Sequence, residues 1–396
     1  MSSLPVIARD SEADVALDVR LDGALERALA DERIVGAVVM VARDGELRYT
    51  RAAGLADREA RTPMREDTLF RLASVTKPIV TAAAMRLVAA GRIALDEPVA
   101  RWLPEFRPTL RDGTPARITL RHLLSHTAGL GYRFLEPDDD GPYARAGVSD
   151  GMDRAPVSLA ENVRRIASVP LQFAPGTSWC YSLATDVVGA LIEAVHERPL
   201  AEAVAELVTT PLGMTATAFV APDAARVATP YVSTAGAPRR MADVEVVPPR
   251  DGTVGIRFEP ARAFDRDAWP SGGAGMIGCA ADCVALLDAL RTGRDGWLAA
   301  EWVDEMARIQ PGADDVPDAP GFGFGLGFSV LRDPVAAQSP ESVGTWRWGG
   351  AYGHAWFVDR AAGLTVVALT NTLYEGAHGR FVTDVRDAVY GAGRAA

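Results

Sequence analysis

A serine and a lysine three positions apart carry the clearest chemical signal in this sequence. The segment reads Ser74-Val75-Thr76-Lys77, and Lys77 is the only lysine, so that 40 of the 41 Lys and Arg residues are arginine (41 − 1). Arginine cannot lose its proton in a protein, whereas a buried lysine amine can be brought toward neutrality and act as a base. The single lysine therefore indicates a site that needs a removable proton.

The spacing of Ser74 and Lys77 fits nucleophilic catalysis. A serine hydroxyl is a poor nucleophile unless a base removes its proton. Residues three apart on a helix share a face, so these two side chains can touch. By chance alone, a lysine would have a serine three residues before it in about 4% of cases, since 15 of the 396 residues are serine. We therefore predict covalent chemistry at Ser74, with Lys77 as a base if burial and neighbouring charge lower the pKa of its amine.

The residues around this pair resemble the first motif of the serine β-lactamase and penicillin-binding protein superfamily, class C branch. The second motif of that superfamily, Tyr-x-Asn, matches in part, and its third, Lys-Thr-Gly, is replaced. Two accessory stretches also look similar, and the matches span nearly the whole chain. The pattern resembles the family VIII carboxylesterases. The segments that carry the motifs and the accessory matches are Phe70–Lys77, His122–Leu130, Tyr181-Ser182-Leu183, Ser271–Met276 and Trp348-Gly349-Gly350.

The resemblance implies a role for each matching residue. Ser74 would be the nucleophile, and Lys77 with Tyr181 would form the general base and acid pair. The backbone N–H groups of Ser74 and Ala351 would form the oxyanion hole. The resemblance also implies a small-molecule ester substrate, and we predict no metal and no cofactor. The substrate pocket would be lined by Trp348, Gly349, Gly350, Leu183 and His126.

Two departures from the lactamase pattern bear on specificity. A lactamase holds the substrate carboxylate with the third-motif lysine, where this chain has the uncharged Trp348, and it binds a side-chain amide with the second-motif asparagine, where this chain has Leu183. Losing one charge-assisted hydrogen bond costs about 1.5–3 kcal/mol. We predict a serine esterase for short-chain carboxylic esters. The alternatives are a β-lactamase, a D-amino-acid peptidase or penicillin-binding activity, an acyltransferase of the same fold, or an inactive binding homologue.

The part played by Tyr181 is open in one respect. A free phenol has a pKa of about 10, and a nearby lysine ammonium would lower it by stabilising the phenolate. Coupled groups titrate as a pair, so the sequence leaves open whether Lys77 or Tyr181 is the resting base. From its spacing alone, Tyr181 would be a buried aromatic residue with a satisfied hydroxyl.

A second serine, Ser149, competes for the role of nucleophile. Residues 147–151 read Gly-Val-Ser-Asp-Gly and fit the G-x-S-x-G elbow of α/β-hydrolases. An elbow needs an apolar strand before it and a helix after it, but the preceding residues 138–143 are acidic and turn-like. The five histidines leave a Ser-His-Asp triad open by count, although loop hydrogen bonding or pocket lining is the interpretation favoured for His126 and His354. The spacing of the His, Asp and Glu residues does not match that of a metal site.

The composition restricts partners and location. The net charge of −11 with no basic run speaks against nucleic acid and anionic membranes as partners. Three cysteines, at positions 180, 279 and 283, favour a reducing compartment. The first 20 residues lack the apolar segment of a signal peptide, and the longest apolar run, 34–42, is too short to span a bilayer. We predict a cytoplasmic enzyme and leave its oligomeric state open.

Both ends of the chain predict strands and a helix. Near the N-terminus these are a helix around 21–29, a strand over 34–41, a hairpin turn at Asp44-Gly45 and a strand at 47–49. The C-terminal part mirrors this order, with strands over 355–358 and 364–369 and a helix over 381–389. The economical fold is α/β, with one antiparallel sheet formed by both termini and flanked by their helices, as the resemblance also implies.

The middle of the chain predicts an inserted helical region. Helical patterns run over 79–90, 160–166, 185–195, 201–208 and 280–290, separated by turn-rich stretches at 136–142 and 229–270. Glycines alternating with aromatic residues over 321–327 suit a strand that passes close to other backbone. We predict a single catalytic unit over 1–396. Its α/β subdomain would comprise 15–80 and 270–396, and a mainly helical, loop-rich subdomain would comprise 81–269.

Overall fold

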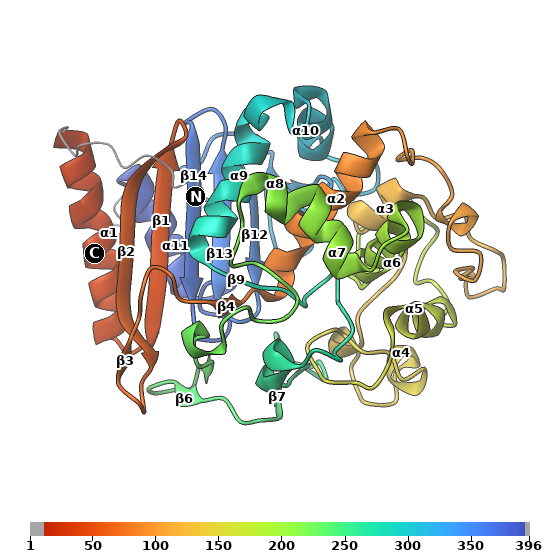
Figure 1. Cartoon of the computed structure of the whole chain (residues 1–396), viewed down its shortest axis with the longest axis horizontal. Helices are drawn as coiled ribbons and strands as arrows, with labels where there is room; N and C mark the ends of the chain where they lie inside the picture. The colour runs from red at the N-terminus through yellow and green to blue at the C-terminus, as the bar shows by residue number, and fades with distance from the viewer. Residues whose placement is uncertain (1–11, 393–396) are drawn as a thin grey trace.

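Strands from the two ends of the chain lie side by side in one eight-stranded sheet in the computed structural model, which describes residues 12–392 (Figure 1). The sheet order is β10-β11-β12-β13-β14-β1-β2-β3. Its strands are β1 Gly36–Arg43, β2 Glu46–Asp57, β3 Thr62–Pro63, β10 Phe322–Phe324, β11 Ser329–Leu331, β12 Trp346–Gly350, β13 His354–Asp359 and β14 Leu364–Thr370. The prediction of no signal peptide rests in part on residues 1–11, which lie outside the described residues.

The junction between β1 and β14 joins the two termini. These strands pair antiparallel, from Ala37 opposite Thr370 to Arg43 opposite Leu364. The hairpin between β1 and β2 turns at Asp44 and Gly45, whose φ angles are +53° and +84°. Such a two-residue turn needs positive φ at both positions, which is why the Asp-Gly pair marked it in the sequence. The predicted sheet formed by both termini is confirmed.

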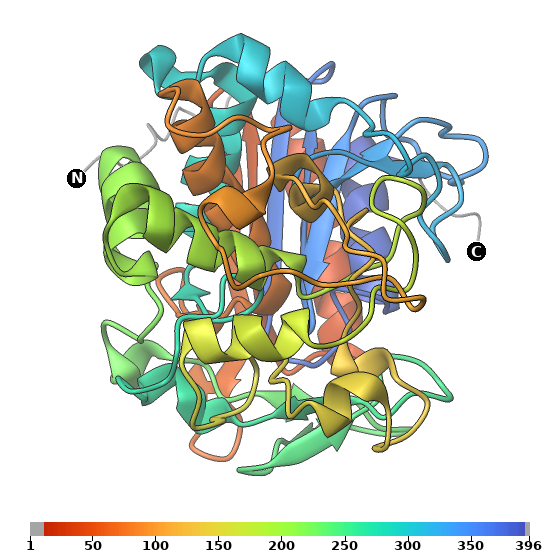
Figure 2. The ribbon, with the colours of Figure 1, turned by 90° about the vertical axis from the view of Figure 1, so that its right-hand side faces the viewer.

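The two faces of the sheet are covered by different helices. Val39 and Val41 of β1 pack into an apolar cluster with α1 (Glu12–Ala30) and α11 (Arg380–Tyr390). Val38 and Met40 point the other way, into the main core with α2 and α9. Figures 1 and 2 show α1 and α11 on one side of the sheet and the rest of the chain on the other.

The helical region is built around α2 and α6. Helices lie at all five predicted places, although the chain turns π-helical over Ala205–Thr209, and α3, α4, α8 and α10 were not predicted. The predicted subdomain boundary at 80–81 falls inside α2, which packs against α6. Within the described residues, none of the helices combines the length and apolarity needed to cross a membrane. The helices are α2 Thr76–Ala89, α3 Leu120–Leu124, α4 Pro142–Arg145, α5 Leu159–Ala167, α6 Ala184–His196, α7 Leu200–Val204, α8 Thr210–Leu212, α9 Ala280–Thr292 and α10 Ala300–Ala307.

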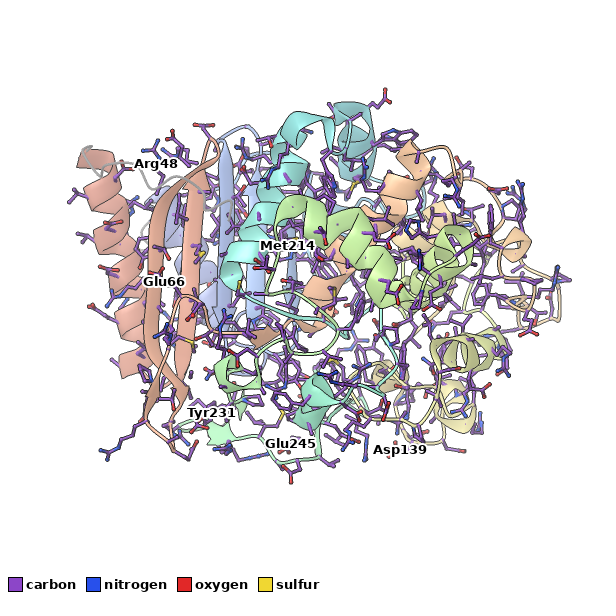
Figure 3. All side chains as sticks on the ribbon, in the orientation of Figure 1. Arg48, Glu66, Asp139, Met214, Tyr231 and Glu245 are labelled. Atoms are coloured by element: carbon purple, nitrogen blue, oxygen red, sulfur yellow. The ribbon has the colours of Figure 1, made fainter. Side chains whose placement is uncertain are left out.

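The turn-rich segment 229–270 contains two short antiparallel pairs. These are β5 (Tyr231–Val232) with β6 (Arg239–Arg240), and β7 (Glu245–Val247) with β8 (Ile256–Phe258). Figure 3 labels Tyr231 and Glu245 at this lower edge of the molecule. The Tyr231 hydroxyl donates to Glu59 at 2.6 Å and accepts from the N–H of Arg58 at 2.7 Å. The segment is thereby fastened to the loop that follows β2.

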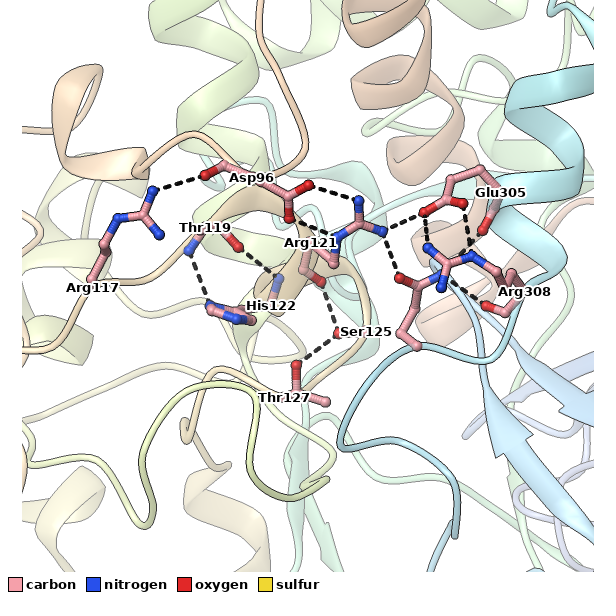
Figure 4. Close-up of polar contacts among 10 residues, drawn as sticks. Asp96, Arg117, Thr119, Arg121, His122, Ser125, Thr127, Glu305 and Arg308 are labelled. Atoms are coloured by element: carbon pink, nitrogen blue, oxygen red, sulfur yellow. Dashed lines mark hydrogen bonds and ion pairs between the residues drawn. The ribbon is translucent and has the colours of Figure 1, made fainter.

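Arg121 connects α3 to two other parts of the chain (Figure 4). Its guanidinium donates to both carboxylate oxygens of Asp96, at 2.7 and 2.9 Å, and to Glu305 on α10 and Gln310. The Arg121 carbonyl accepts from the Ser125 hydroxyl at 2.8 Å, and Ser125 also contacts Thr127. The start of the 122–130 stretch is therefore fixed by a polar network.

Replacing Arg121 by alanine should lower the free energy of unfolding by about 1–3 kcal/mol, because Glu305 and Gln310 lose a partly buried partner. Equilibrium unfolding in urea measures this. The matched control is Arg101→Ala, which removes an ion pair to Glu97 from an arginine that is mostly exposed. That change should alter stability by about 0.5 kcal/mol or less. Equal losses in the two variants would contradict a structural role for the Arg121 network.

Candidate active site

Ser74 lies in a short 3₁₀ turn, Ala73–Val75, directly before α2. The residue before it, Ala73, has a φ of +47°, a conformation that residues with side chains rarely adopt. Such strain costs about 1–3 kcal/mol and persists only where the surrounding structure fixes it. Here the fixing bonds come from Met276, whose carbonyl accepts from the N–H of Leu72 at 2.9 Å and whose N–H donates to Thr76 Oγ1 at 3.1 Å.

The three predicted catalytic side chains meet at one oxygen atom. Lys77 Nζ lies 3.2 Å from Ser74 Oγ, and the Tyr181 hydroxyl lies 2.6 Å from the same Oγ. Lys77 is 1% exposed. Its Nζ also donates to the carbonyl of Gly273 at 2.8 Å and lies 4.7 Å from the centre of the Tyr181 ring. Helix α2 thus supplies Lys77, and the loop before α6 supplies Tyr181.

This arrangement can activate the serine in two ways. The Tyr181 hydroxyl donates to Ser74 Oγ as the structure has it. If Tyr181 has given up its proton, the same two atoms carry a hydrogen bond in the opposite direction, from the serine hydroxyl to the phenolate. The amine of Lys77 lies 3.2 Å from Ser74 Oγ and 4.7 Å from the centre of the Tyr181 ring. A proton removed from Ser74 can therefore be held by either group, which is the chemistry that an activated serine requires.

Two further side chains, those of Tyr132 and His126, lie close to Lys77 and Tyr181, and both are uncharged at neutral pH. Tyr132 lies with its ring 5.0 Å from that of Tyr181, and burial, together with the nearby Tyr181, raises its pKa well above the usual range. The ring Nδ1 of His126 lies 3.0 Å from Ser182 Oγ. Burial, and then the charge of Lys77, lowers the pKa of His126 well below its usual value. The side chains that hydrogen-bond Ser74 among the described residues are those of Lys77 and Tyr181, and neither Tyr132 nor His126 is one of them.

The end of β12 approaches the turn that carries Ser74. A Cβ atom added to Gly350 would lie 2.5 Å from the carbonyl of Leu72, so only glycine allows this approach. The next residue, Ala351, accepts a hydrogen bond from the N–H of Tyr374 at 2.9 Å. Its own N–H has no hydrogen-bond partner among the described residues. The predicted oxyanion hole, formed by the N–H groups of Ser74 and Ala351, stays a prediction to which this approach lends support.

His354 ties the first residues of β13 to the strand before the nucleophile. Its Nε2–H donates to the carbonyl of Arg71 at 2.8 Å, and its ring packs edge-on against Phe70. Burial lowers the pKa of His354 to about 4, so the ring is neutral at neutral pH. His354 therefore joins the start of β13, three residues after Ala351, to the residues before the nucleophile turn, and it has no hydrogen bond to Ser74.

Aromatic side chains form one wall beside Tyr181. The ring of Trp348 lies 5.3 Å from that of Tyr181 and 5.2 Å from that of Phe324, which is in turn 5.5 Å from Trp179. Trp179 and Trp348 are half-buried, whereas Phe324 is fully buried. None of these aromatic side chains carries a charge, and Trp179, Phe324 and Trp348 belong to one apolar cluster. The wall therefore favours an apolar, uncharged part of a substrate.

The structure corrects the predicted pocket in two places. Leu183 is 0% exposed and His126 is 1% exposed, so neither side chain presents surface to a substrate. Leu183 precedes α6 and packs into the core, and His126 is enclosed by aromatic rings. A separate cavity of about 20 Å³ lies behind the turn after Gly350 and is lined by residues that include Arg71, Met276 and Tyr352. It contains none of the predicted pocket residues.

Ser149 and the histidines form no alternative catalytic set. Ser149 is 2% exposed, lies in a loop, and donates to Asp153 at 2.5 Å while accepting from the N–H of Gly151. Within residues 12–392, no hydrogen bond joins a histidine to Ser74 or to Ser149. In the same part of the chain, no three His, Cys, Asp or Glu side chains gather in a way that could hold a metal ion.

The site contains residues that the motifs did not mark. Asp186, on the first turn of α6, is 0% exposed and accepts from the Ser271 hydroxyl at 2.6 Å and from the N–H of Gly273 at 3.0 Å. Tyr132 also was not predicted. The available signal was an aspartate near the start of a mostly apolar helical stretch, because a carboxylate on a buried face requires specific partners.

Comparison with known proteins gives a consistent result. The family model described as Beta-lactamase matches residues 21–390. The chain is 53% identical to Esterase EstB of Burkholderia gladioli over 376 residues, which is 95% of each chain. The solved structure of EstCE1, described as a hydrolase with promiscuous acyltransferase activity, superposes with a TM-score of 0.93 at 44% identity and covers 96% of this chain and 100% of its own. Monacolin J acid methylbutanoyltransferase of Aspergillus terreus is 29% identical over 400 residues, 88% of this chain and 89% of its own.

Proposed function

The chain belongs to the Beta-lactamase family, and we propose that within it the protein is a serine carboxylesterase that hydrolyses short-chain esters through an acyl-enzyme on Ser74. The observation that carries the proposal is the meeting of Lys77 Nζ and the Tyr181 hydroxyl at Ser74 Oγ, at 3.2 and 2.6 Å. The identity to Esterase EstB over 95% of both chains supports the ester as substrate class.

Acylation begins with the transfer of the Ser74 proton to the Tyr181 and Lys77 pair. Oγ then forms a bond to the ester carbonyl carbon, and the carbonyl oxygen becomes an oxyanion. We assign the stabilisation of that oxyanion to the N–H groups of Ser74 and Ala351, since preorganised donors of this kind are worth about 10²–10³-fold in kcat. The pair returns the proton to the leaving alkoxide, the bond between carbon and alkoxide oxygen breaks, and the alcohol departs.

Deacylation repeats these steps with water. The Tyr181 and Lys77 pair removes a proton from a water molecule, which attacks the acyl carbon and re-forms the oxyanion. The bond to Ser74 Oγ then breaks, and the serine recovers its proton from the same pair. The product is the free carboxylic acid. Each half-reaction uses the pair first as base and then as acid, which requires that its proton stay mobile.

The substrate preference follows from two side chains. Trp348 replaces a cation that would bind a carboxylate, and its half-buried ring belongs to an uncharged aromatic wall. Leu183 is fully buried and stands where a lactamase has an asparagine, so the hydrogen bond to an amide is missing as well. Both changes remove polar recognition of a β-lactam, and Trp348 leaves an apolar surface. The absence of the third-motif lysine also speaks against a D-amino-acid peptidase or penicillin-binding activity.

Esters from roughly acetyl to hexanoyl should be hydrolysed with kcat/KM far above that for a β-lactam, by about 10²-fold or more, since losing the two polar contacts costs about 1.5–3 kcal/mol each. A series of p-nitrophenyl esters from acetate to palmitate, measured beside nitrocefin, checks this. A cephalosporin with an acetyl ester side chain provides an internal control, because the ester should be cleaved with the lactam ring left intact. Comparable kcat/KM values for nitrocefin and p-nitrophenyl butyrate would contradict the proposal.

A second candidate is transfer of the acyl group to an alcohol. The similarity to EstCE1, described as having promiscuous acyltransferase activity, and to a methylbutanoyltransferase favours it. The same acyl-enzyme serves both reactions, and only the attacking hydroxyl differs. Ester formation in the presence of an added alcohol, measured against acid release, separates the two.

We also propose a cytoplasmic location, which rests on the three free cysteines and their sparse, odd number.

A further inference from the structure

A buried carboxylate lies behind the loop that binds Lys77. Asp186 Oδ1 accepts two hydrogen bonds, from the Ser271 hydroxyl at 2.6 Å and from the Gly273 N–H at 3.0 Å. The carbonyl of the same Gly273 accepts the hydrogen bond of Lys77 Nζ at 2.8 Å. Gly273 therefore links the two charged groups. Its N–H donates to the Asp186 carboxylate, and its C=O accepts from the Lys77 ammonium.

The other carboxylate oxygen of Asp186 faces the same place without a partner. Among the described residues, Oδ2 is buried and has no hydrogen bond. A Cβ atom added to Gly273 would lie 3.0 Å from this oxygen and 3.4 Å from the Tyr132 hydroxyl, so the absence of a side chain at Gly273 lets the carboxylate come close. Oδ1 takes both hydrogen bonds, which leaves Oδ2 to contribute charge alone.

We propose that Asp186 is a positioning residue for catalysis, which fixes the Gly273 carbonyl that binds Lys77 and supplies the negative charge that balances the Lys77 ammonium. The inference rests on the proposed function, because it assigns a part in the reaction to a residue that acts through Lys77. It adds to the three catalytic side chains a fourth, buried group that sets the pH at which their shared proton is released.

Few charged groups lie around Lys77 and Asp186. Lys77 faces the Ser74 hydroxyl, the rings of Tyr181 and Tyr132, and the Gly273 carbonyl, and its charge also reaches the neutral His126. Burial raises the pKa of Asp186, while the bonds from Ser271 and Gly273 and the charges of Lys77 and Arg262 oppose this rise. Of the other carboxylates, Asp150 acts on Tyr132. Asp186 is thus a buried carboxylate on whose pKa the charge of Lys77 acts.

The test uses Asp186→Asn, which is nearly identical in shape. The asparagine oxygen can keep both hydrogen bonds of Oδ1, and its amide nitrogen takes the place of the unpartnered Oδ2, so the variant removes charge and retains geometry. Loss of a negative charge makes the Lys77 ammonium less stable and a Tyr181 phenolate more stable. Whichever group holds the proton, the pair should release it at lower pH. The acid limb of the kcat/KM profile should move down by about one pH unit.

The matched control is Asp282→Asn. Asp282 is also buried, at 7% exposure, and one of its oxygens accepts from the Ala216 N–H at 2.9 Å and the Thr217 hydroxyl at 2.8 Å. Besides burial, the groups that shift its pKa most are Thr217, Ala216, Cys279 and Arg226, and Lys77 is not one of them. This variant should leave the pH profile in place. Asp186→Ala, which removes the hydrogen bonds as well, should lower kcat by about 10²-fold with little change in KM, since the Lys77 amine is no longer held. Asparagine should restore most of that loss.

An active Asp186→Asn enzyme whose acid limb coincides with that of the Asp282→Asn control would overturn the inference, because Asp186 would then carry no charge that Lys77 senses. So would an Asp186→Ala enzyme with unchanged kcat. Failure of the proposed function has a different signature, namely an absence of esterase activity in the wild-type protein or its retention in Ser74→Ala. The two failures are therefore distinguishable.

Discussion

Replacing Ser74 by alanine should abolish ester hydrolysis, with kcat falling by about 10⁴-fold or more. Alanine has no oxygen to bond to the acyl carbon, so the acyl-enzyme cannot form. The lost hydroxyl is the atom at which Lys77 Nζ and the Tyr181 hydroxyl converge. Initial rates with p-nitrophenyl butyrate measure the loss, and circular dichroism verifies that the variant is folded.

The matched control for this change is Ser149→Ala. Ser149 is buried and bonds to Asp153 and to the N–H of Gly151, so its removal affects a loop and not the reaction. The folded Ser149→Ala enzyme should keep most of its specific activity. The reverse result, with Ser149→Ala inactive and Ser74→Ala active, would mean that the chemistry resides at the G-x-S-x-G segment.

Lys77→Arg should lower kcat by about 10²–10⁴-fold in a folded protein. Arginine keeps the positive charge and most of the length, and the chain already uses it at 40 positions (41 − 1). Its pKa stays above about 12 in any protein site, so it cannot give up or pass on a proton. A large loss of kcat would therefore assign proton transfer, and not charge alone, to the single lysine.

The opposite outcome has a defined meaning as well. If folded Lys77→Arg kept wild-type kcat to within about tenfold, below the usual contribution of a general base, Lys77 would act only as a charge that stabilises the Tyr181 phenolate. Tyr181 would then be the only base. A parallel Tyr181→Phe variant shows whether the phenol is needed under the same conditions, because phenylalanine preserves the ring contacts with Trp348 and His126.

The two ends of the chain were predictable because their signals are local. The apolar run over 34–42, the Asp44-Gly45 turn and the helical spacing of Phe381 and Val385 each fix a short element. The pairing of β1 with β14 then follows from the need to bury both apolar faces. The helices α3, α4 and α8 were missed because they are only three to five residues long, and α10 was missed because its short apolar pattern is broken by charges.

The site residues that belong to recognisable sequence motifs could be predicted. Ser74, Lys77 and Tyr181 stand in recognisable surroundings, and the structure places their reactive atoms together. Asp186 was not found, because its partners Ser271 and Gly273 lie more than 80 residues away in the sequence. The positive φ of Ala73 was also not predictable, since the bonds that hold it come from Met276 on another segment. Leu183 was misplaced for a similar reason, as burial depends on packing across the fold.

Covalent labelling of the nucleophile tests the central claim most directly. A fluorophosphonate reacts irreversibly with an activated serine, and digestion followed by mass spectrometry identifies the labelled peptide. We expect a single adduct on Ser74, absent in the folded Lys77→Arg variant if the lysine activates the serine by proton transfer. An adduct on the peptide containing Ser149, or no adduct in a wild-type enzyme that hydrolyses esters, would contradict the assignment of Ser74 as the nucleophile.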